Sequence, residues 1–221
     1  MPAGLLALAF IPVVIGSIRV VQLLGGPAGM EPDARFEAAP TAVVVHLVAS
    51  IGYAVLGAFQ FSPRLRRRGW HRRAGRVLVP LGLVVAGSGL WLTLLYDRKD
   101  GTGTLLYSVR LLVGASMAAC VVLGVTAIRR RDIRLHRAWM TRAYALALGA
   151  GTQAFTVGFG EALFGTGVLR TDLMMSAGWG LNLAVAELLI RRSPRTQLPR
   201  QRQHASTQPG TRHRTVVGEA Q

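Results

Sequence analysis

The chain has 221 residues, 51% of them hydrophobic, and a formal net charge of +16. The hydrophobic residues occur in blocks of about 20, the length of a transmembrane helix, which predicts an all-α integral membrane protein. In a soluble protein such a charge would indicate nucleic acid binding. Here the basic residues lie in short segments beside the apolar blocks, so anionic lipid headgroups are the expected partner and nucleic acid is not. The single cysteine excludes intramolecular disulfides and multi-cysteine metal sites.

Six apolar segments are long enough to cross a bilayer. We predict spans at residues 5–24, 41–61, 77–96, 105–128, 138–159 and 173–190. The first resembles the apolar part of a secretory signal peptide. No Lys or Arg precedes it and Arg19 interrupts it, so we predict a retained span.

Arginine is distributed unevenly among the connecting segments. Segment 64–76, RLRRRGWHRRAGR, carries seven arginines and no acid, whereas segment 25–40 has three acids and one arginine. Segment 129–137, RRRDIRLHR, is also strongly basic. Basic segments stay in the cytoplasm, which predicts a multi-pass membrane protein with both termini inside. Residues 1–191 form the predicted six-span domain, and residues 192–221, rich in Arg, Pro, Ser and Gln, form a predicted disordered cytoplasmic tail.

Polar or small residues follow one face of the second predicted span. They recur at steps of four, three, four and three, at His46, Ser50, Tyr53, Gly57 and Gln60. This spacing places them on one side of a helix, turned away from lipid. The stripe is either a seam between packed helices or the lining of a proton or solute path.

Ionisable residues inside spans are costly and are usually paired or functional. His46 and Arg110 lie five or six residues below the outer ends of their predicted helices, where Asp172 is an available acid. These residues either bind an anion from outside or tie helices together, although an arginine there can also snorkel to the interface. At the inner boundary, Arg142 and Glu187 lie at matching depths. We predict an ion pair between them, joining the fifth and sixth spans.

Two histidines, His71 and His136, each precede a helix that runs outward. If both helices extend inward, the two imidazoles share one depth and have the geometry for bis-histidine ligation of haem b. The arrangement is similar to half of a cytochrome b561, but His46 has no histidine partner on the fourth span, so a second haem is not supported. The alternative is a pair of interfacial histidines hydrogen-bonded to backbone or headgroups.

Several short motifs together resemble one known family. They are the His46 helix ending in Gln60-Phe61, His71-Arg72 with Gly75-Arg76, His136-Arg137-Ala138-Trp139-Met140 with Arg142 and Tyr144, and Asn182-Leu183 with Glu187. Over residues 40–190 the chain resembles the bacterial multi-pass membrane proteins of domain of unknown function 2306. The resemblance implies a membrane location and a helical architecture, and it implies no activity.

The sequence contains no complete catalytic signature, so we do not predict an enzyme. We expect an integral membrane protein of unknown biochemical activity that binds a small ligand in a polar bundle interior. A haem-binding electron carrier and a small-solute or proton transporter are the alternative hypotheses.

Overall fold

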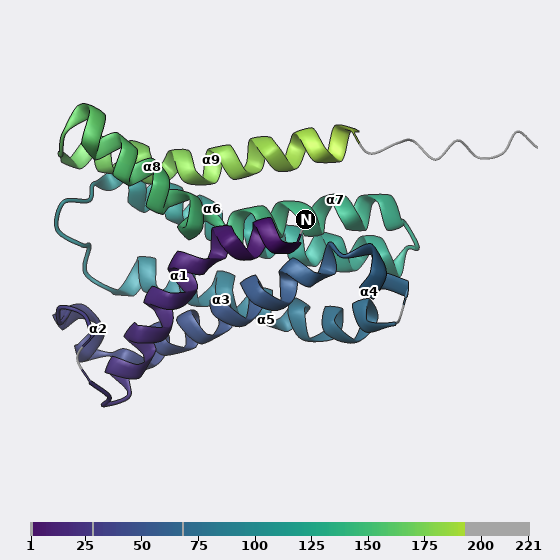
Figure 1. Cartoon of the computed structure of the whole chain (residues 1–221), viewed down its shortest axis with the longest axis horizontal. Helices are drawn as coiled ribbons and strands as arrows, with labels where there is room; N and C mark the ends of the chain where they lie inside the picture. Colours follow the sequence, from purple (N-terminus) through teal and green to yellow (C-terminus); the bar gives the residue numbers. More distant parts are fainter. Residues whose placement is uncertain (1, 28, 68, 193–221) are drawn as a thin grey trace, which may run out of the picture. The chain divides into compact units, whose positions relative to one another are not determined.

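Helices account for all the regular structure in the described part of the protein (Figure 1). The computed structural model describes residues 2–27, 29–67 and 69–192, and these residues form nine helices and no strand. The predicted all-α class is therefore confirmed. Residues 193–221, nearly all of the predicted tail, lie outside the described residues.

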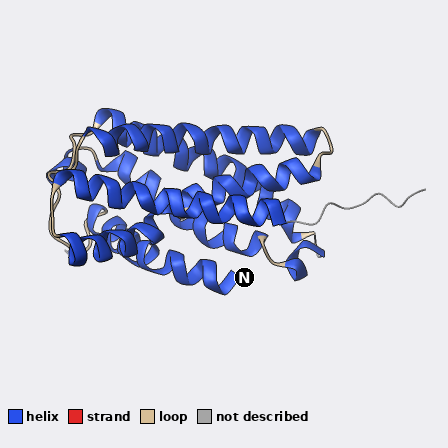
Figure 2. Ribbon diagram, turned by 90° about the horizontal axis from the view of Figure 1, so that it is seen from above, coloured by secondary structure: helices blue, strands red, loops and turns tan. Residues whose placement is uncertain are grey.

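Five helices are long and apolar enough to cross a membrane. They are α1 (Pro2–Leu23), α3 (Pro40–Gln60), α5 (Trp70–Leu95), α6 (Thr104–Arg129) and α9 (Val168–Arg192). The long helices run roughly side by side (Figure 2). Large apolar side chains on them, such as Phe10, Leu112 and Leu181, are more than half exposed. In a membrane protein, lipid covers such side chains.

Four shorter helices complete the described chain. They are α2 (Ala34–Ala38), α4 (Pro63–Arg67), α7 (Ile133–Ala147) and α8 (Gly149–Phe164). The carboxylate of Asp132 accepts a hydrogen bond from the backbone N–H of Leu135 at 2.8 Å, which caps the start of α7.

The basic segment at residues 64–76 is more helical than the sequence predicted. It contains most of α4 and the first turns of α5, separated by Gly69 in a left-handed conformation with φ of 70°. We expected the third span to begin at residue 77, but α5 begins at Trp70, because arginine has a high helix propensity and the helix extends into the arginine-rich segment that precedes the apolar block. His71 and His136 consequently lie in the first turns of α5 and α7.

The fifth predicted span, residues 138–159, is not a single helix. α7 ends at Ala147 and α8 begins at Gly149, with Leu148 outside both helices. These helices have 15 and 16 residues, each shorter than the roughly 20 that cross a bilayer. The described residues therefore contain five uninterrupted candidate spans, and the expectation of one continuous helix here is wrong.

Close approaches to two other helices explain why this helix breaks. A Cβ added at Gly149 would lie 2.0 Å from the indole nitrogen of Trp179 on α9, and one at Gly151 would lie 2.3 Å from the carbonyl oxygen of Leu8 on α1. Only glycine fits at both positions, and glycine also weakens a helix interior. The same two glycines thus account for both the tight packing and the break in the helix.

The side chain of Asn182 on α9 bridges the two sides of the break. Its Nδ2 donates to the carbonyl oxygen of Ala145, four residues before Gly149, at 3.1 Å. Its Oδ1 accepts from the hydroxyl of Thr152 at 2.7 Å. Inside a membrane, a bond such as that to Ala145 satisfies a backbone carbonyl that an interrupted helix leaves free.

Candidate functional site

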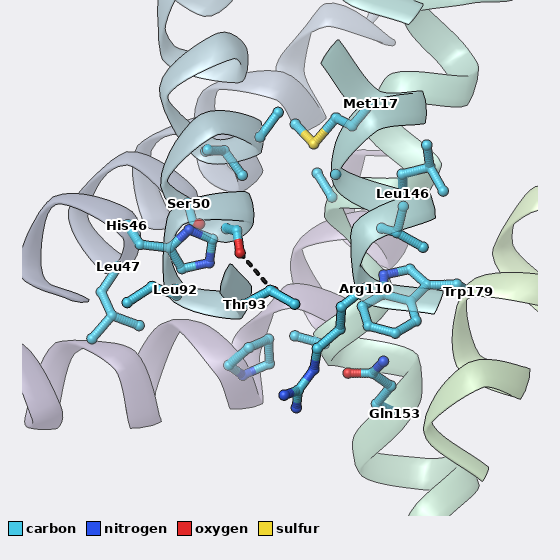
Figure 3. Close-up of a pocket in the computed structure, with 18 of the residues that line it drawn as sticks. His46, Leu47, Ser50, Leu92, Thr93, Arg110, Met117, Leu146, Gln153 and Trp179 are labelled. Carbon is cyan, nitrogen blue, oxygen red and sulfur yellow. Dashed lines mark hydrogen bonds between the residues drawn. The ribbon is translucent and has the colours of Figure 1, made fainter. Parts of the chain in front are cut away.

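A cavity of about 430 Å³ lies within the helix bundle, a volume typical of small-molecule pockets. Its walls come from α1, α3, α5, α6, the break between α7 and α8, and α9, and its mouth from α2 and the α5–α6 loop. The polar groups inside it are His46, Ser50, Thr93, Arg110, Gln153 and Trp179 (Figure 3). The residues around the break, 146–148 and 150–151, also line the cavity, so the interruption of the helix forms part of the wall.

Arg110 extends into this cavity from α6, and Gln153 lines the same cavity from α8 (Figure 3). Arg110 lies six residues after the start of α6 at Thr104, which is about 9 Å along the helix. The ion pairs of the described residues are Arg35–Asp33 and Arg142–Glu187, so Arg110 has no carboxylate within 4 Å in this part of the chain. An arginine at such depth without an acidic partner is a candidate ligand contact.

Asp172, the acid expected near Arg110, is occupied elsewhere. It is only 2% exposed, and its two oxygens accept hydrogen bonds from the backbone N–H groups of Gly103 at 2.9 Å and Leu106 at 3.1 Å. These are among the first amides of α6, which have no partner within the helix. Asp172 therefore caps α6 from α9, a structural contact that the sequence did not predict, and it does not line the cavity.

His46 lines the cavity from α3 and is held by Ser88 on α5. Its Nδ1 lies 2.9 Å from the hydroxyl oxygen of Ser88, and that hydroxyl also lies 2.5 Å from the carbonyl oxygen of Val84. In the tautomer that donates from Nδ1 to Ser88, the hydroxyl hydrogen goes to Val84 and Nε2 of the neutral ring is an acceptor. The hydroxyl of Ser50, one turn along α3, is buried against the same cavity with no hydrogen-bond partner among the described residues.

The polar stripe of α3 changes role along the helix. Towards the C-terminal end of α3, Tyr53 is 5% exposed and packs against Tyr144, with 6.0 Å between ring centroids. A Cβ at Gly57 would lie 2.4 Å from the Tyr144 ring, so this half of the stripe is a packing seam. Gln60 places its Nε2 3.5 Å from the carbonyl oxygen of His71. Neither Tyr53 nor Gln60 lines the cavity.

The predicted ion pair between Arg142 and Glu187 forms in the structure. Arg142 donates from Nε to Oε1 at 2.5 Å and from Nη2 to Oε2 at 3.0 Å, a bidentate geometry. Its guanidinium also lies over the Trp139 ring, 4.7 Å from the centroid. The pair joins α7 to α9 and lies outside the cavity lining, so its observed role is to hold helices together.

The two histidines considered as haem ligands also lie outside the cavity lining. Nδ1 of His136 is 2.8 Å from the carbonyl oxygen of Gly124 on α6. This bond orients the ring and directs Nε2 away from Gly124, as second-shell carbonyls do for ligating histidines. The backbone carbonyl of His71 receives the weak Gln60 contact. Haem ligation by these residues stays a prediction.

Comparison with protein families gives one match. The model of a family described as predicted membrane protein (DUF2306) matches residues 43–190. The chain belongs to this family. The expected family resemblance is thus confirmed, and the match includes His46, Arg110 and the Arg142–Glu187 pair within one DUF2306 segment. No curated protein and no solved structure matches the chain.

Sequence reasoning missed three polar residues of the cavity, Thr93, Gln153 and Trp179. Gln153 is 8% exposed, and its Nε2 donates to the carbonyl oxygen of Met175 at 2.9 Å. A glutamine within an apolar block was a visible signal, because a buried amide requires a partner. Trp179 lies in the middle of α9, away from the membrane interfaces where tryptophan is usual in a span.

Proposed function

We propose that this chain is a six-span protein of a bacterial cytoplasmic membrane that binds a small ligand in its interior cavity. In this arrangement both termini are cytoplasmic, and α7 and α8 together form an interrupted fifth span. The hydrogen bonds of Asn182 support that reading, since one satisfies the backbone carbonyl of Ala145 before the break and the other ties Asn182 to the Thr152 side chain after it. The basic segments support the orientation, and the cavity mouth is then extracytoplasmic.

The observation that carries the proposal is the set of polar groups in the cavity that lack partners. The Arg110 guanidinium forms no ion pair within 4 Å, and the Ser50 hydroxyl is buried without a hydrogen bond in the described protein. Unsatisfied polar groups in a bundle interior are unfavourable and are retained where something binds them. A cavity large enough for a small molecule lies against both groups.

A transport function is the second candidate, and the same cavity favours it as an outward-facing site. Its described lining extends along α6 as far as Met117 and along α3 as far as Ala54. Beyond that level, Tyr144 donates to the carbonyl oxygen of Ala54 at 2.7 Å and packs against Tyr53. Transport therefore requires these two tyrosines to separate, whereas binding alone requires no movement.

Two neighbouring residues of α6 provide a matched test of ligand binding. Val113 lines the cavity, whereas Leu112 is 66% exposed on the outer surface of the helix. We expect Val113→Trp to fill the cavity and remove any small molecule that co-purifies with the full chain, as measured by mass spectrometry of extracts. Leu112→Trp should retain that molecule. Equal retention in both variants, or no enriched molecule in the wild type, would overturn the proposal.

A labelling experiment keeps the test valid if Val113→Trp does not fold. In a chain whose single cysteine, Cys120, is replaced by Ala, Val113→Cys should react with a small neutral thiosulfonate reagent in water. Leu112→Cys, surrounded by lipid or detergent, should react at least about tenfold more slowly, because a thiol reacts as the thiolate and an apolar environment disfavours it. Equal rates would show that the cavity is closed to water.

A further inference from the structure

The mouth of the cavity and its polar wall carry mostly positive charge. The cavity lining contains four cations, Arg35, Arg98, Lys99 and Arg110, and one acid, Asp97. Two of the cations have local partners at the mouth. Arg35 is paired with Asp33 at 2.6 Å, and the guanidinium of Arg98 lies 5.1 Å from the Tyr107 ring centroid. Neither Lys99, in the loop at the mouth, nor Arg110, the cation farthest inside the bundle, has such a partner in the described chain.

The opposite end of the cavity is apolar. Its lining there includes Ala86 from α5, Val113 and Met117 from α6, and Leu146 from α7. Met117 lies seven residues after Arg110, which corresponds to about 10 Å along α6. The binding space therefore has a cationic end and an apolar end about 10 Å apart.

We infer that the ligand is an amphiphilic oxyanion, a carboxylate or phosphate with a short apolar tail, whose anionic group binds Arg110. This inference rests on the proposed function of the cavity. A guanidinium presents paired donors that match the oxygens of a carboxylate or phosphate. The tail occupies the region between Val113 and Met117, where a compact inorganic anion would leave apolar wall exposed to water.

Neighbouring polar groups suit this position of the anion. The Ser50 hydroxyl has its hydrogen available, and His46 becomes a second donor at Nε2 when its ring is protonated. Gln153 uses its amide nitrogen on Met175, so its amide oxygen remains to accept a hydrogen bond from a donor in the cavity that Arg110 also lines (Figure 3). The anion would thus supply the negative charge for Arg110, which forms no ion pair with a described side chain.

Charge-selective labelling tests the role of Arg110. In the Cys120→Ala background, the cavity cysteine Val113→Cys is reacted with thiosulfonate reagents carrying a sulfonate, a trimethylammonium group or no charge. The full chain is kept in an uncharged detergent, so that any preference for one reagent charge comes from the protein and not from the detergent. We expect the anionic reagent to react about tenfold faster than the cationic one, because a cationic cleft concentrates anions. Arg110→Gln should abolish most of this preference, and Arg110→Lys should retain it.

Protection of the same cysteine tests the class of ligand. Hexanoate or hexyl phosphate should slow labelling by the neutral reagent saturably, and whichever protects at lower concentration identifies the preferred oxyanion. Hexanamide controls for the tail without charge, and inorganic phosphate controls for charge without a tail. Both controls should protect at least about tenfold less well, and Arg110→Gln should weaken the protection by the two amphiphilic anions.

The outcomes separate this inference from the proposed function. If no reagent labels Val113→Cys, the cavity is not open and both ideas fail. If the neutral reagent labels it but the charge preference is the same in Arg110→Gln, the cavity is open and Arg110 does not bind an anion; the side chain then reaches the interface as a snorkelling arginine. Equal protection by hexanamide or by inorganic phosphate would overturn the amphiphilic oxyanion.

Discussion

The ion pair between Arg142 and Glu187 gives the strongest quantitative prediction. Removing one partner of a fully buried pair costs about 3–5 kcal/mol, and an exposed pair contributes about 0–1 kcal/mol. The side chains of Arg142 and Glu187 are 24% and 34% exposed, so the appropriate value lies between these limits. We expect each single alanine variant to lose about 1–2 kcal/mol of unfolding free energy.

The two single variants should not be equal. Arg142→Ala also removes the contact with the Trp139 ring, worth about 0.5–1 kcal/mol at a partly exposed site. It leaves the Glu187 carboxylate without its bidentate partner, whereas after Glu187→Ala the guanidinium keeps the indole. Arg142→Ala should therefore be the more destabilising change. Arg142→Lys should recover part of the loss, because it restores the charge without the bidentate geometry.

Thermal unfolding of the purified full chain in detergent measures these effects. A loss of 1 kcal/mol corresponds to about 2–4 °C for a protein of this size. The control is Arg134→Ala, an exposed arginine on the first turn of the same helix, which should change the midpoint by less than about 1 °C. The double variant should lose about 1 kcal/mol less than the sum of the singles. Strictly additive losses would refute a direct interaction.

Three further predictions concern the cap, the topology and the haem hypothesis. Asp172→Ala should lower the unfolding midpoint by the equivalent of about 1–2 kcal/mol, because two α6 amides lose their acceptor; an unchanged midpoint would contradict the cap. In a cysteine-free chain in intact cells, an impermeant reagent should label Ala34→Cys and not Arg73→Cys, and the reverse pattern would invert the orientation. If His71 and His136 hold haem, chain expressed with ample haem will show a Soret band that either alanine variant removes; a colourless wild type would exclude the electron carrier.

Spacing and composition were sufficient to predict most of the helices and one long-range contact. Apolar blocks of bilayer length marked the five long helices, because hydrocarbon admits only backbone that satisfies its own hydrogen bonds. The Arg142–Glu187 pair followed from depth alone, since few acids lie in the spans and consecutive antiparallel helices bring equal depths together. The break at Leu148 did not follow, because it depends on Trp179 and Leu8 approaching two glycines from helices distant in sequence.

The cavity could be predicted only in part, for a related reason. His46 and Arg110 were visible as polar groups at similar depth, but their depth does not say which acids reach them. Asp172 lies at a suitable level, yet its carboxylate is held by the backbone of Gly103 and Leu106. Which group the Asp172 carboxylate binds depends on where the start of α6 lies relative to α9. The packing of the two helices determines this position, and the sequence of either segment alone does not.

The polar stripe of α3 shows how one periodic signal can describe two different environments. A step of three or four residues places side chains on one helix face, but it does not say what fills the space opposite that face. Opposite Gly57 the Tyr144 ring fills it, and opposite Ser50 the cavity remains. The difference comes from the partner helices: Tyr144 projects from the intact part of α7, whereas the cavity wall is formed where α7 ends. The interruption that removes a continuous fifth helix thus also forms part of the wall of the cavity that Arg110 lines.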